Sequence, residues 1–315
     1  VHTDRIGMEY PMICFNGGRP EKDGTYSERT KYGMISVIIH EVGHNFFPMI
    51  VNSDERQWTW MDEGLNSFVQ YLSEQEWEKD YPSRRGAAYK ITDYMSAEKN
   101  EMVPIMTNSE SILQFGNNAY GKPATALNIL RETIMGRELF DYSFKRYCQR
   151  WMFKHPTPAD FFRTMEDASA VDLDWFFRSW FYTTDHVDIA LRDVRYLKLD
   201  TKNPDVENKR MRAEAAARRK YIGDLRNDTL FQGKHYSDEV PSMLDFYNKN
   251  DEYTTFAADR EDYDKYVEGL GEDEKALLKE NYNFYELTFD NLGGIPMPVI
   301  LSFTFKDGSS QKVQV

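Results

Sequence analysis

HEVGH at residues 40–44, followed after 18 intervening residues by Glu63 in the run WMDEG, is the stretch that decides how this chain must fold. Side chains four residues apart lie on one face of an α-helix, so His40 and His44 can point at one cation. Glu41 projects from the same turn at an angle to that face, where it can reach a water without binding the cation. The spacing predicts two helices that meet, one carrying both histidines and the other carrying Glu63.

Two imidazoles and one carboxylate are ligands that zinc prefers. We therefore predict one Zn²⁺ per chain, bound by His40, His44 and Glu63, with the fourth position open for water, as in catalytic sites. Zinc lowers the pKa of such a water to about 7. Glu41 is placed to take its proton and pass it to a leaving amine. This chemistry indicates a hydrolase of amide bonds.

The composition limits the partners of the protein. The net charge is −13, which argues against nucleic acid or an anionic membrane as the main partner. No run of 18 apolar residues is present, so we expect no transmembrane helix. The two cysteines, Cys14 and Cys148, do not form a CxxC pair, and we expect both to be buried thiols. The compartment and the oligomeric state stay undefined.

The pattern of apolar residues predicts a helix from Ser27 to Met49, ended by Pro48, and a second from Trp58 to Lys79. Residues 5–15 read as an extended edge segment. Further helices are expected over 84–98, 119–134 and 138–152. Thr157 is expected to be the N-cap of another helix. The aromatic run LDWFFRSWFY at 173–182 is also expected to be helical and to lie in the core.

The character of the chain changes near residue 190. Residues 191–282 are rich in charge and alanine and predict exposed helices. From residue 283 the apolar period becomes two, with turn signals at Gly293-Gly294 and at 306–308. This pattern predicts a β-meander, which resembles the start of a β-sandwich. The first residues do not read as a signal peptide, and both ends lie close to strand-like sequence, so we expect a piece of a longer protein.

The ligand pattern resembles that of the gluzincin zinc metallopeptidases, and most closely that of the aminopeptidase N family. Three other stretches are similar to this family. GMEY, which is Gly7, Met8, Glu9 and Tyr10, resembles its exopeptidase motif Gly-x-Met-Glu-Asn. AYGKPATALNIL contains Tyr120 and resembles the segment with the catalytic tyrosine, and residues 155–186 resemble the end of the catalytic domain.

The resemblance implies roles for individual residues. His40, His44 and Glu63 would bind zinc, Glu41 would act as general base and then as acid, and Tyr120 would donate to the oxyanion. Gly7, Met8 and Glu9 would form the substrate-binding motif, in which Glu9 binds the free α-ammonium of a peptide. Without the resemblance, Glu9 would read as a surface acid and Tyr120 as a packing residue.

The resemblance also implies a fold. We expect an α+β protein with a mostly helical thermolysin-like (gluzincin) catalytic domain at 1–190 that lacks its N-terminal part. A charged helical segment at 191–282 and the beginning of a β-sandwich at 283–315 would follow. Tyr10 stands where the family usually has Asn, and NFFP follows HEVGH where Trp-Phe-Gly is common. The resemblance implies a preceding β domain that helps to bind the substrate amine, and we expect the fragment to lack it and to be weakly active.

The resulting hypothesis is a zinc metalloaminopeptidase that acts on peptides with a free N-terminus. Two alternatives remain open. A thermolysin-like endopeptidase would use the same zinc chemistry on internal bonds, and a non-catalytic peptide-binding module would keep the fold without turnover.

Overall fold

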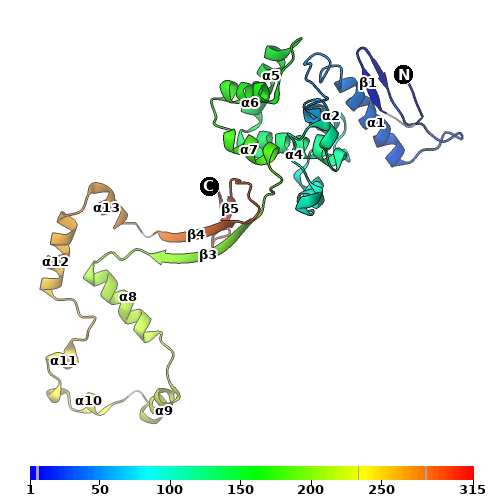
Figure 1. Cartoon of the computed structure of the whole chain (residues 1–315). Helices are drawn as coiled ribbons and strands as arrows, with labels where there is room; N and C mark the ends of the chain where they lie inside the picture. Colours follow the sequence, from blue (N-terminus) through cyan, green and yellow to red (C-terminus); the bar gives the residue numbers. More distant parts are fainter. Residues whose placement is uncertain (5–6, 233, 281) are drawn as a thin grey trace. The chain divides into compact units, whose positions relative to one another are not determined.

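The structure is a computed structural model that describes residues 1–4, 7–232, 234–280 and 282–315 (Figure 1). It divides into two compact units, one formed by Val1–Ala190 together with Asp290–Val315 and the other by Leu191–Phe289. Both helices and strands are present, which confirms the expected mixed class. No helix in the described parts of the chain is long and apolar enough to cross a membrane.

The first unit is mainly helical and contains the sequence motifs. Its strands are β1 (Met8–Tyr10), β2 (Ile13–Phe15), β5 (Ile300–Thr304) and β6 (Ser310–Gln314). Its α-helices are α1 (Glu28–Gly43), α2 (Leu65–Trp77), α3 (Thr92–Met95), α4 (Lys122–Ile129), α5 (Arg137–Trp151), α6 (Pro158–Ser169) and α7 (Asp174–Tyr182). Single π-helical turns precede α2 and flank α4, namely η1 (Trp60–Gly64), η5 (Gly116–Gly121) and η6 (Leu130–Ile134), and 3₁₀ turns lie at η2 (Ala88–Lys90), η3 (Lys99–Glu101) and η4 (Ser109–Ser111).

Helix α1 begins where the sequence predicts and ends earlier. Ser27 is its N-cap, and the Ser27 hydroxyl accepts a hydrogen bond from the Thr30 amide at 3.2 Å. The helix ends at Gly43, and residues 44–50 form hydrogen-bonded turns. The ring of Pro48 would clash with the carbonyl of His44 four residues earlier if the helix continued. The expected extension of this helix to Met49 is therefore wrong.

Several other expected elements are found. The predicted helix from Trp58 to Lys79 is present as η1 followed by α2, and the helices at 119–134 and 138–152 are present as η5–α4–η6 and α5. Thr157 caps α6 through a capping box with Asp160. The extended segment at 5–15 instead folds back as the β1–β2 hairpin, which pairs Glu9 with Cys14. Its first residues, 5 and 6, lie outside the described chain.

The expected helix at 84–98 is wrong for most of its length, since only α3 and the turn η2 form there. Gly86 has a φ of +98°, a left-handed conformation that interrupts a right-handed helix. The ring of Tyr71 lies so close that a Cβ on Gly86 would be 2.3 Å from it. Tertiary packing against α2 therefore sets the backbone of this loop.

The core of the first unit is aromatic and holds η1 in place. The Trp60 ring is 1% exposed and meets the rings of Phe161 and Phe181 at centroid distances of 5.7 and 4.8 Å. Rings from α6 and α7 thus pack on the residue three positions before Glu63. The run at 173–182 contributes Phe176, Phe177, Trp180 and Phe181 to the core, as the sequence predicts.

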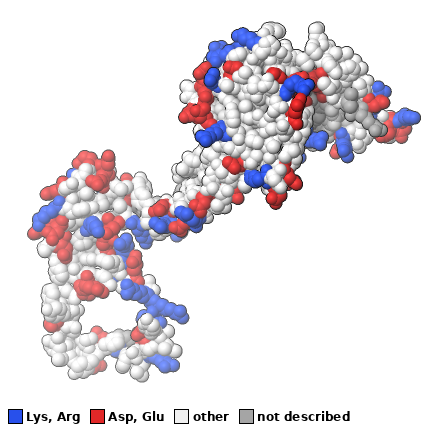
Figure 2. All heavy atoms as spheres, viewed as in Figure 1, with Lys and Arg blue, Asp and Glu red and all other residues white. Residues whose placement is uncertain are grey.

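The second unit is rich in charged residues. Its α-helices are α8 (Pro204–Ala216), α9 (Ile222–Phe231), α10 (Tyr236–Glu239), α11 (Phe246–Lys249), α12 (Ala257–Glu268) and α13 (Glu272–Leu277), with a 3₁₀ turn η7 (Pro241–Met243). Most of its described residues are exposed, as expected for solvated helices. Figure 2 shows acidic and basic side chains interspersed over its visible face.

The C-terminal strands pair differently from a meander. β4 (Asn283–Asn291) pairs with β3 (Ile189–Lys198), whereas β5 pairs with β6 in an antiparallel ladder. In the described chain, β4 and β5 are thus not neighbours, and the expected β-meander is correct only for β5 and β6. Both cysteines are free, and each is only partly buried, so the expectation of fully buried thiols is wrong.

Candidate metal centre

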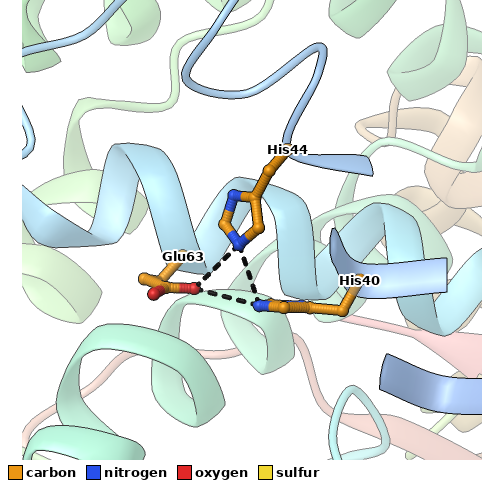
Figure 3. A group of neighbouring side chains, drawn as sticks. All are labelled: His40, His44 and Glu63. Atoms are coloured by element: carbon orange, nitrogen blue, oxygen red, sulfur yellow. Dashed lines mark hydrogen bonds and ion pairs between the residues drawn. The ribbon is translucent and has the colours of Figure 1, made fainter. Parts of the chain in front are cut away.

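The last turn of α1 and the π-helical turn η1 bring His40, His44 and Glu63 together (Figure 3). His40 Nε2 lies 3.0 Å from His44 Nε2 and 3.1 Å from Glu63 Oε2. His44 Nε2 lies 3.4 Å from the same carboxylate oxygen. These three atoms form a small triangle of electron-pair donors that face one another.

This donor set fits a zinc ion. Ligand atoms of a tetrahedral site with metal–ligand distances near 2.0–2.1 Å lie about 3.3 Å apart, and the three separations here are 3.0, 3.1 and 3.4 Å. Two imidazole nitrogens and a carboxylate oxygen that converge in this way are strongly stabilised by a cation between them. Burial alone would raise the pKa of Glu63, but its contacts with His40, His44 and Tyr120 outweigh burial and lower that pKa to about 2. The carboxyl is therefore ionised at neutral pH.

Further contacts fix the orientation of both imidazoles. His40 Nδ1 lies 2.9 Å from Gln70 Oε1. His44 Nδ1 lies 2.8 Å from the carbonyl oxygen of Phe47 and 2.9 Å from Asp62 Oδ1. A donor hydrogen on each Nδ1 leaves the lone pair on Nε2 for a metal, as is usual for histidine ligands.

A glycine lets the two helices approach. A Cβ on Gly43 would lie 2.2 Å from Asn66 Oδ1, so only glycine fits there while Asn66 keeps its place. Asn66 Nδ2 donates to the carbonyl oxygen of His40 at 2.8 Å. The glycine within HEVGH thus allows α2 to pack on the turn that carries the histidines.

Glu41 lies beside the histidines with an oxygen that is free to accept a proton. Its side chain is 5% exposed, and its Oε2 has no hydrogen-bond partner among the described residues. Burial raises the pKa of Glu41, although His40 and His44 partly offset this effect. A Cβ on Gly7 would lie 2.2 Å from Glu41 Oε1, so the strand segment of the GMEY motif runs directly along this carboxylate.

Tyr120 and Glu9 also border the histidines. The Tyr120 hydroxyl donates to Glu63 Oε1, and its ring stacks on the imidazole of His40 at a centroid distance of 5.9 Å. Glu9 lies on β1, with its Oε2 3.9 Å from His44 Nε2. Glu9, Glu41 and His44 each place a ligand-type atom within 4.8 Å of the others.

A cleft of about 830 Å³ opens beside these residues. His40, Glu41 and Tyr120 line it, together with residues of α1, of α2 and of the loop after α2. Its volume lies in the range of about 300–1,000 Å³ typical of small-ligand sites. A small ligand can therefore reach the candidate centre.

The sequence matches the Peptidase family M1 domain over residues 19–180, which is just over half of the chain. The chain belongs to peptidase family M1. The match confirms the resemblance to the aminopeptidase N family inferred from the motifs.

Curated relatives of this M1 chain include aminopeptidases. It is 24% identical to glutamyl aminopeptidase of Sus scrofa over 170 residues, which are 51% of this chain and 18% of the relative. It is 27% identical to glutamyl aminopeptidase of Bos taurus over 158 residues (48% and 16%) and 25% identical to endoplasmic reticulum aminopeptidase 1 of Homo sapiens over 154 residues (46% and 16%). The matched part thus spans less than a fifth of these relatives.

The solved structures that the chain matches include an M1 zinc metallopeptidase mutant of Deinococcus radiodurans bound to a Tyr-Ser-Ala substrate. The identity is 19%, the match covers 50% of this chain and 35% of that chain, and the TM-score is 0.41. A mutant two-domain M1 zinc metallopeptidase bound to L-tryptophan matches at 18% identity, 52% and 35% coverage and a TM-score of 0.42.

All eight site residues expected from the sequence of this M1 chain lie in the described chain, and the structure gathers Glu9, His40, Glu41, His44, Glu63 and Tyr120 in one place. Gly7 approaches Glu41, while the Met8 side chain is 37% exposed. The sequence analysis missed Asp62, Asn66 and Gln70. The last two lie on α2, three and seven residues after Glu63 of the preceding turn η1, a spacing that favours one side of a helix.

Proposed function

We propose that this M1 chain carries the catalytic centre of a zinc aminopeptidase, which hydrolyses the N-terminal peptide bond of peptides. The convergence of His40 Nε2, His44 Nε2 and Glu63 Oε2 within 3.4 Å of one another carries the proposal. These three residues would hold one zinc ion. The names of the curated relatives, glutamyl aminopeptidase among them, support the same reaction.

When bound in such a site, zinc polarises the peptide carbonyl and makes a water more acidic. Glu41 acts on that water as the general base, because its Oε2 is buried, lies beside both histidines and has no competing partner among the described residues. The same oxygen then delivers the proton to the nitrogen of the leaving amine.

Tyr120 stabilises the negative charge that develops on the carbonyl oxygen. Its hydroxyl is held at the edge of the site by Glu63, and its ring is stacked on His40. A hydroxyl donor aimed at the developing oxyanion is a typical way to lower this barrier.

Glu9 selects peptides with a free N-terminus. Its carboxylate lies 3.9 Å from His44 Nε2 and is mostly buried, so a substrate ammonium beside it gains a charge-assisted hydrogen bond. An acetylated N-terminus leaves this carboxylate without a partner, which costs free energy. This difference distinguishes an aminopeptidase from a thermolysin-like endopeptidase.

The fold expected from the resemblance is part of the proposal. Residues 1–190 are proposed as a thermolysin-like catalytic domain, 191–282 as a charged helical segment and 283–315 as strands of a β-sandwich. Val1–Ala190 lie in one compact unit, which also includes Asp290–Val315, and this supports the first assignment, while the exposed charged helices support the second. The antiparallel β5–β6 pair supports the third.

The test uses the full-length protein, metal quantitation and a panel of free and N-acetylated peptides. We expect one zinc per chain and cleavage of free peptides only. Glu41→Gln should keep its zinc and lose about 100- to 10,000-fold in turnover.

Three results would contradict the proposal. Equal cleavage of free and acetylated peptides, or internal cleavage products, would favour an endopeptidase. A protein without bound zinc, in which Glu41→Gln changes nothing, would indicate a non-catalytic peptide-binding module.

A further inference from the structure

Three cations stand together on one side of the cleft. Arg84, Arg85 and Lys90, which we call the cationic wall, line both the 830 Å³ cleft and a neighbouring cavity of about 470 Å³. Arg84 and Lys90 are exposed, whereas Arg85 is half-buried. The side of the cleft beyond Tyr120 is therefore positively charged.

Arg85 is the innermost member of the wall. Its guanidinium carbon lies 4.4 Å from the centroid of the Tyr120 ring. Among the described residues it has no carboxylate or hydrogen-bond partner. Burial and the neighbouring Arg84 lower the pKa of Arg85, which reflects the free-energy cost of holding this charge away from water. A ligand carboxylate would offset that cost through a bidentate contact.

The loop that carries the wall is fixed rather than free. Ser83 Oγ donates to the buried Glu74 Oε2 at 2.5 Å, and the Tyr81 hydroxyl donates to the carbonyl oxygen of Tyr32 at 2.9 Å. Asn128 Nδ2 donates to the carbonyl oxygen of Gly86 at 3.2 Å. These contacts hold both sides of Arg84 and Arg85, so little conformational entropy is lost when a ligand binds.

Glu74, an acid that also lines the cleft, partly stabilises the charge of Arg85 through space, but its hydrogen bonds go to other residues. It is 2% exposed and accepts hydrogen bonds from Ser36 and Gln70 at 2.7 Å, in addition to that from Ser83. Its charge is thus already satisfied by three donors.

The cationic wall and Glu9 lie beside different histidines of the candidate metal centre. Glu9 lies next to His44, whereas Arg85 lies on Tyr120, whose ring stacks on His40. A peptide with its ammonium at Glu9 and its first carbonyl at the centre would extend towards Arg85. The group that meets the wall would belong to the residues after the scissile bond.

We propose that the cationic wall of Arg84, Arg85 and Lys90 binds a carboxylate of the substrate on the C-terminal side of the scissile bond. The carboxylate is either an acidic side chain or the C-terminus of a very short peptide. This inference rests on the proposed aminopeptidase function and names the class of peptide that the centre prefers.

The experiment compares two pairs of peptides on the full-length, zinc-loaded protein. Ala-Glu-Ala-amide against Ala-Gln-Ala-amide tests a side-chain carboxylate, and Ala-Ala-Ala with a free C-terminus against its amide tests a terminal one. We expect KM to be about 10-fold lower for the carboxylate member of one pair. Arg85→Gln should abolish that ratio, Arg85→Lys should keep part of it, and Arg146→Gln, at an exposed position on α5, should leave it unchanged.

Binding of the same peptides to the Glu41→Gln variant, measured by calorimetry, provides a readout without turnover. Equal KM within both pairs would overturn the inference. An equal loss of kcat for all four peptides in Arg85→Gln would also overturn it, because Arg85 would then be a positioning residue for Tyr120. If wild-type protein cleaves none of the four, the proposed function fails, while the calorimetric preference for a carboxylate still decides the role of the wall.

Discussion

His40 Nδ1 lies 2.9 Å from Oε1 of Gln70, a residue on α2 seven positions after Glu63. The Gln70 amide is itself oriented, because its Nε2 donates to Glu74 Oε1 at 2.7 Å. Its oxygen must then accept from His40, which places the proton on Nδ1 and the lone pair on Nε2. Helix α2 thus supplies a partner for His40, and the turn η1 before it supplies the carboxylate of the candidate metal centre.

Gln70→Ala should weaken zinc binding by about 10- to 100-fold, because His40 loses the contact that fixes its tautomer and ring orientation. Competition with chelators of graded affinity measures the effect. Gln149→Ala, at an exposed position on α5, is the matched control and should bind zinc as the wild type does. Equal zinc affinity in both variants would mean that Gln70 does not orient the ligand.

Glu9→Gln should reduce kcat/KM for free peptides by about 10- to 100-fold, because the substrate ammonium loses a charge-assisted partner. Cleavage of acetylated peptides should not fall in parallel, so the preference for a free N-terminus shrinks. Steady-state kinetics on matched free and acetylated peptides check this. Glu21→Gln, in the exposed loop before α1, should keep the wild-type preference, and an unchanged preference in Glu9→Gln would remove Glu9 from amine recognition.

Gly43→Ala should lower the free energy of unfolding by about 1–3 kcal/mol, since the new methyl group would displace Asn66. Gly33→Ala, in the same helix, has nothing within 4 Å of its Cβ and should stabilise the protein by up to about 1 kcal/mol through helix propensity. Urea unfolding of both variants measures the contrast. In an Asn66→Ala background the cost of Gly43→Ala should shrink, and an unchanged cost would place the strain elsewhere.

Lys122 is a buried cation outside the metal centre. Its side chain is 0% exposed, and its Nζ donates to the carbonyl oxygen of Thr183 at 3.0 Å. Burial, assisted by Lys99 and only partly opposed by Asp185, lowers the pKa of Lys122 from 10.5 to about 8. Between pH 8 and 10.5 the unfolded chain therefore binds more protons here than the folded chain, and stability rises with pH.

The contribution of Lys122 should grow by about 2–3 kcal/mol between pH 8 and 10, relative to a Lys122→Met variant that cannot titrate. Urea midpoints of both proteins across this range measure the difference. Lys145→Met, at an exposed position on α5, should follow the wild-type curve. Parallel pH profiles for wild type and Lys122→Met would show that the folded lysine titrates normally.

Local rules predicted most of the helical scaffold. The helix start at Ser27 and the N-cap at Thr157 lie where the sequence places them, because a helix start depends on side chains within a few residues. The predicted end of α1 at Met49 was wrong. The ring of Pro48 would clash with the carbonyl of His44, so the helix has to end before His44 and not only at the proline.

Long-range contacts decided the loop after α2. Its residues favour a helix locally, but Tyr71 packs on Gly86 and Glu74 binds Ser83, and these contacts impose a bent backbone. Arg84 and Arg85 thereby reach the cleft. No repeat of apolar residues along the sequence indicates that these side chains lie at the cleft, so the sequence analysis did not identify either arginine.

The sequence by itself determined the ligand types and the pairing of His40 with His44, because a spacing of four residues on a helix fixes which side chains share a face. The motifs predicted that Glu63, Tyr120 and Glu9 join them, but only the tertiary structure shows how these residues approach and that Gln70 lies beside His40. Those residues come from other elements, and their approach depends on helix packing through Gly43 and on the aromatic core around Trp60. Such packing is set by shape complementarity across the fold, which a repeat pattern along the chain does not encode.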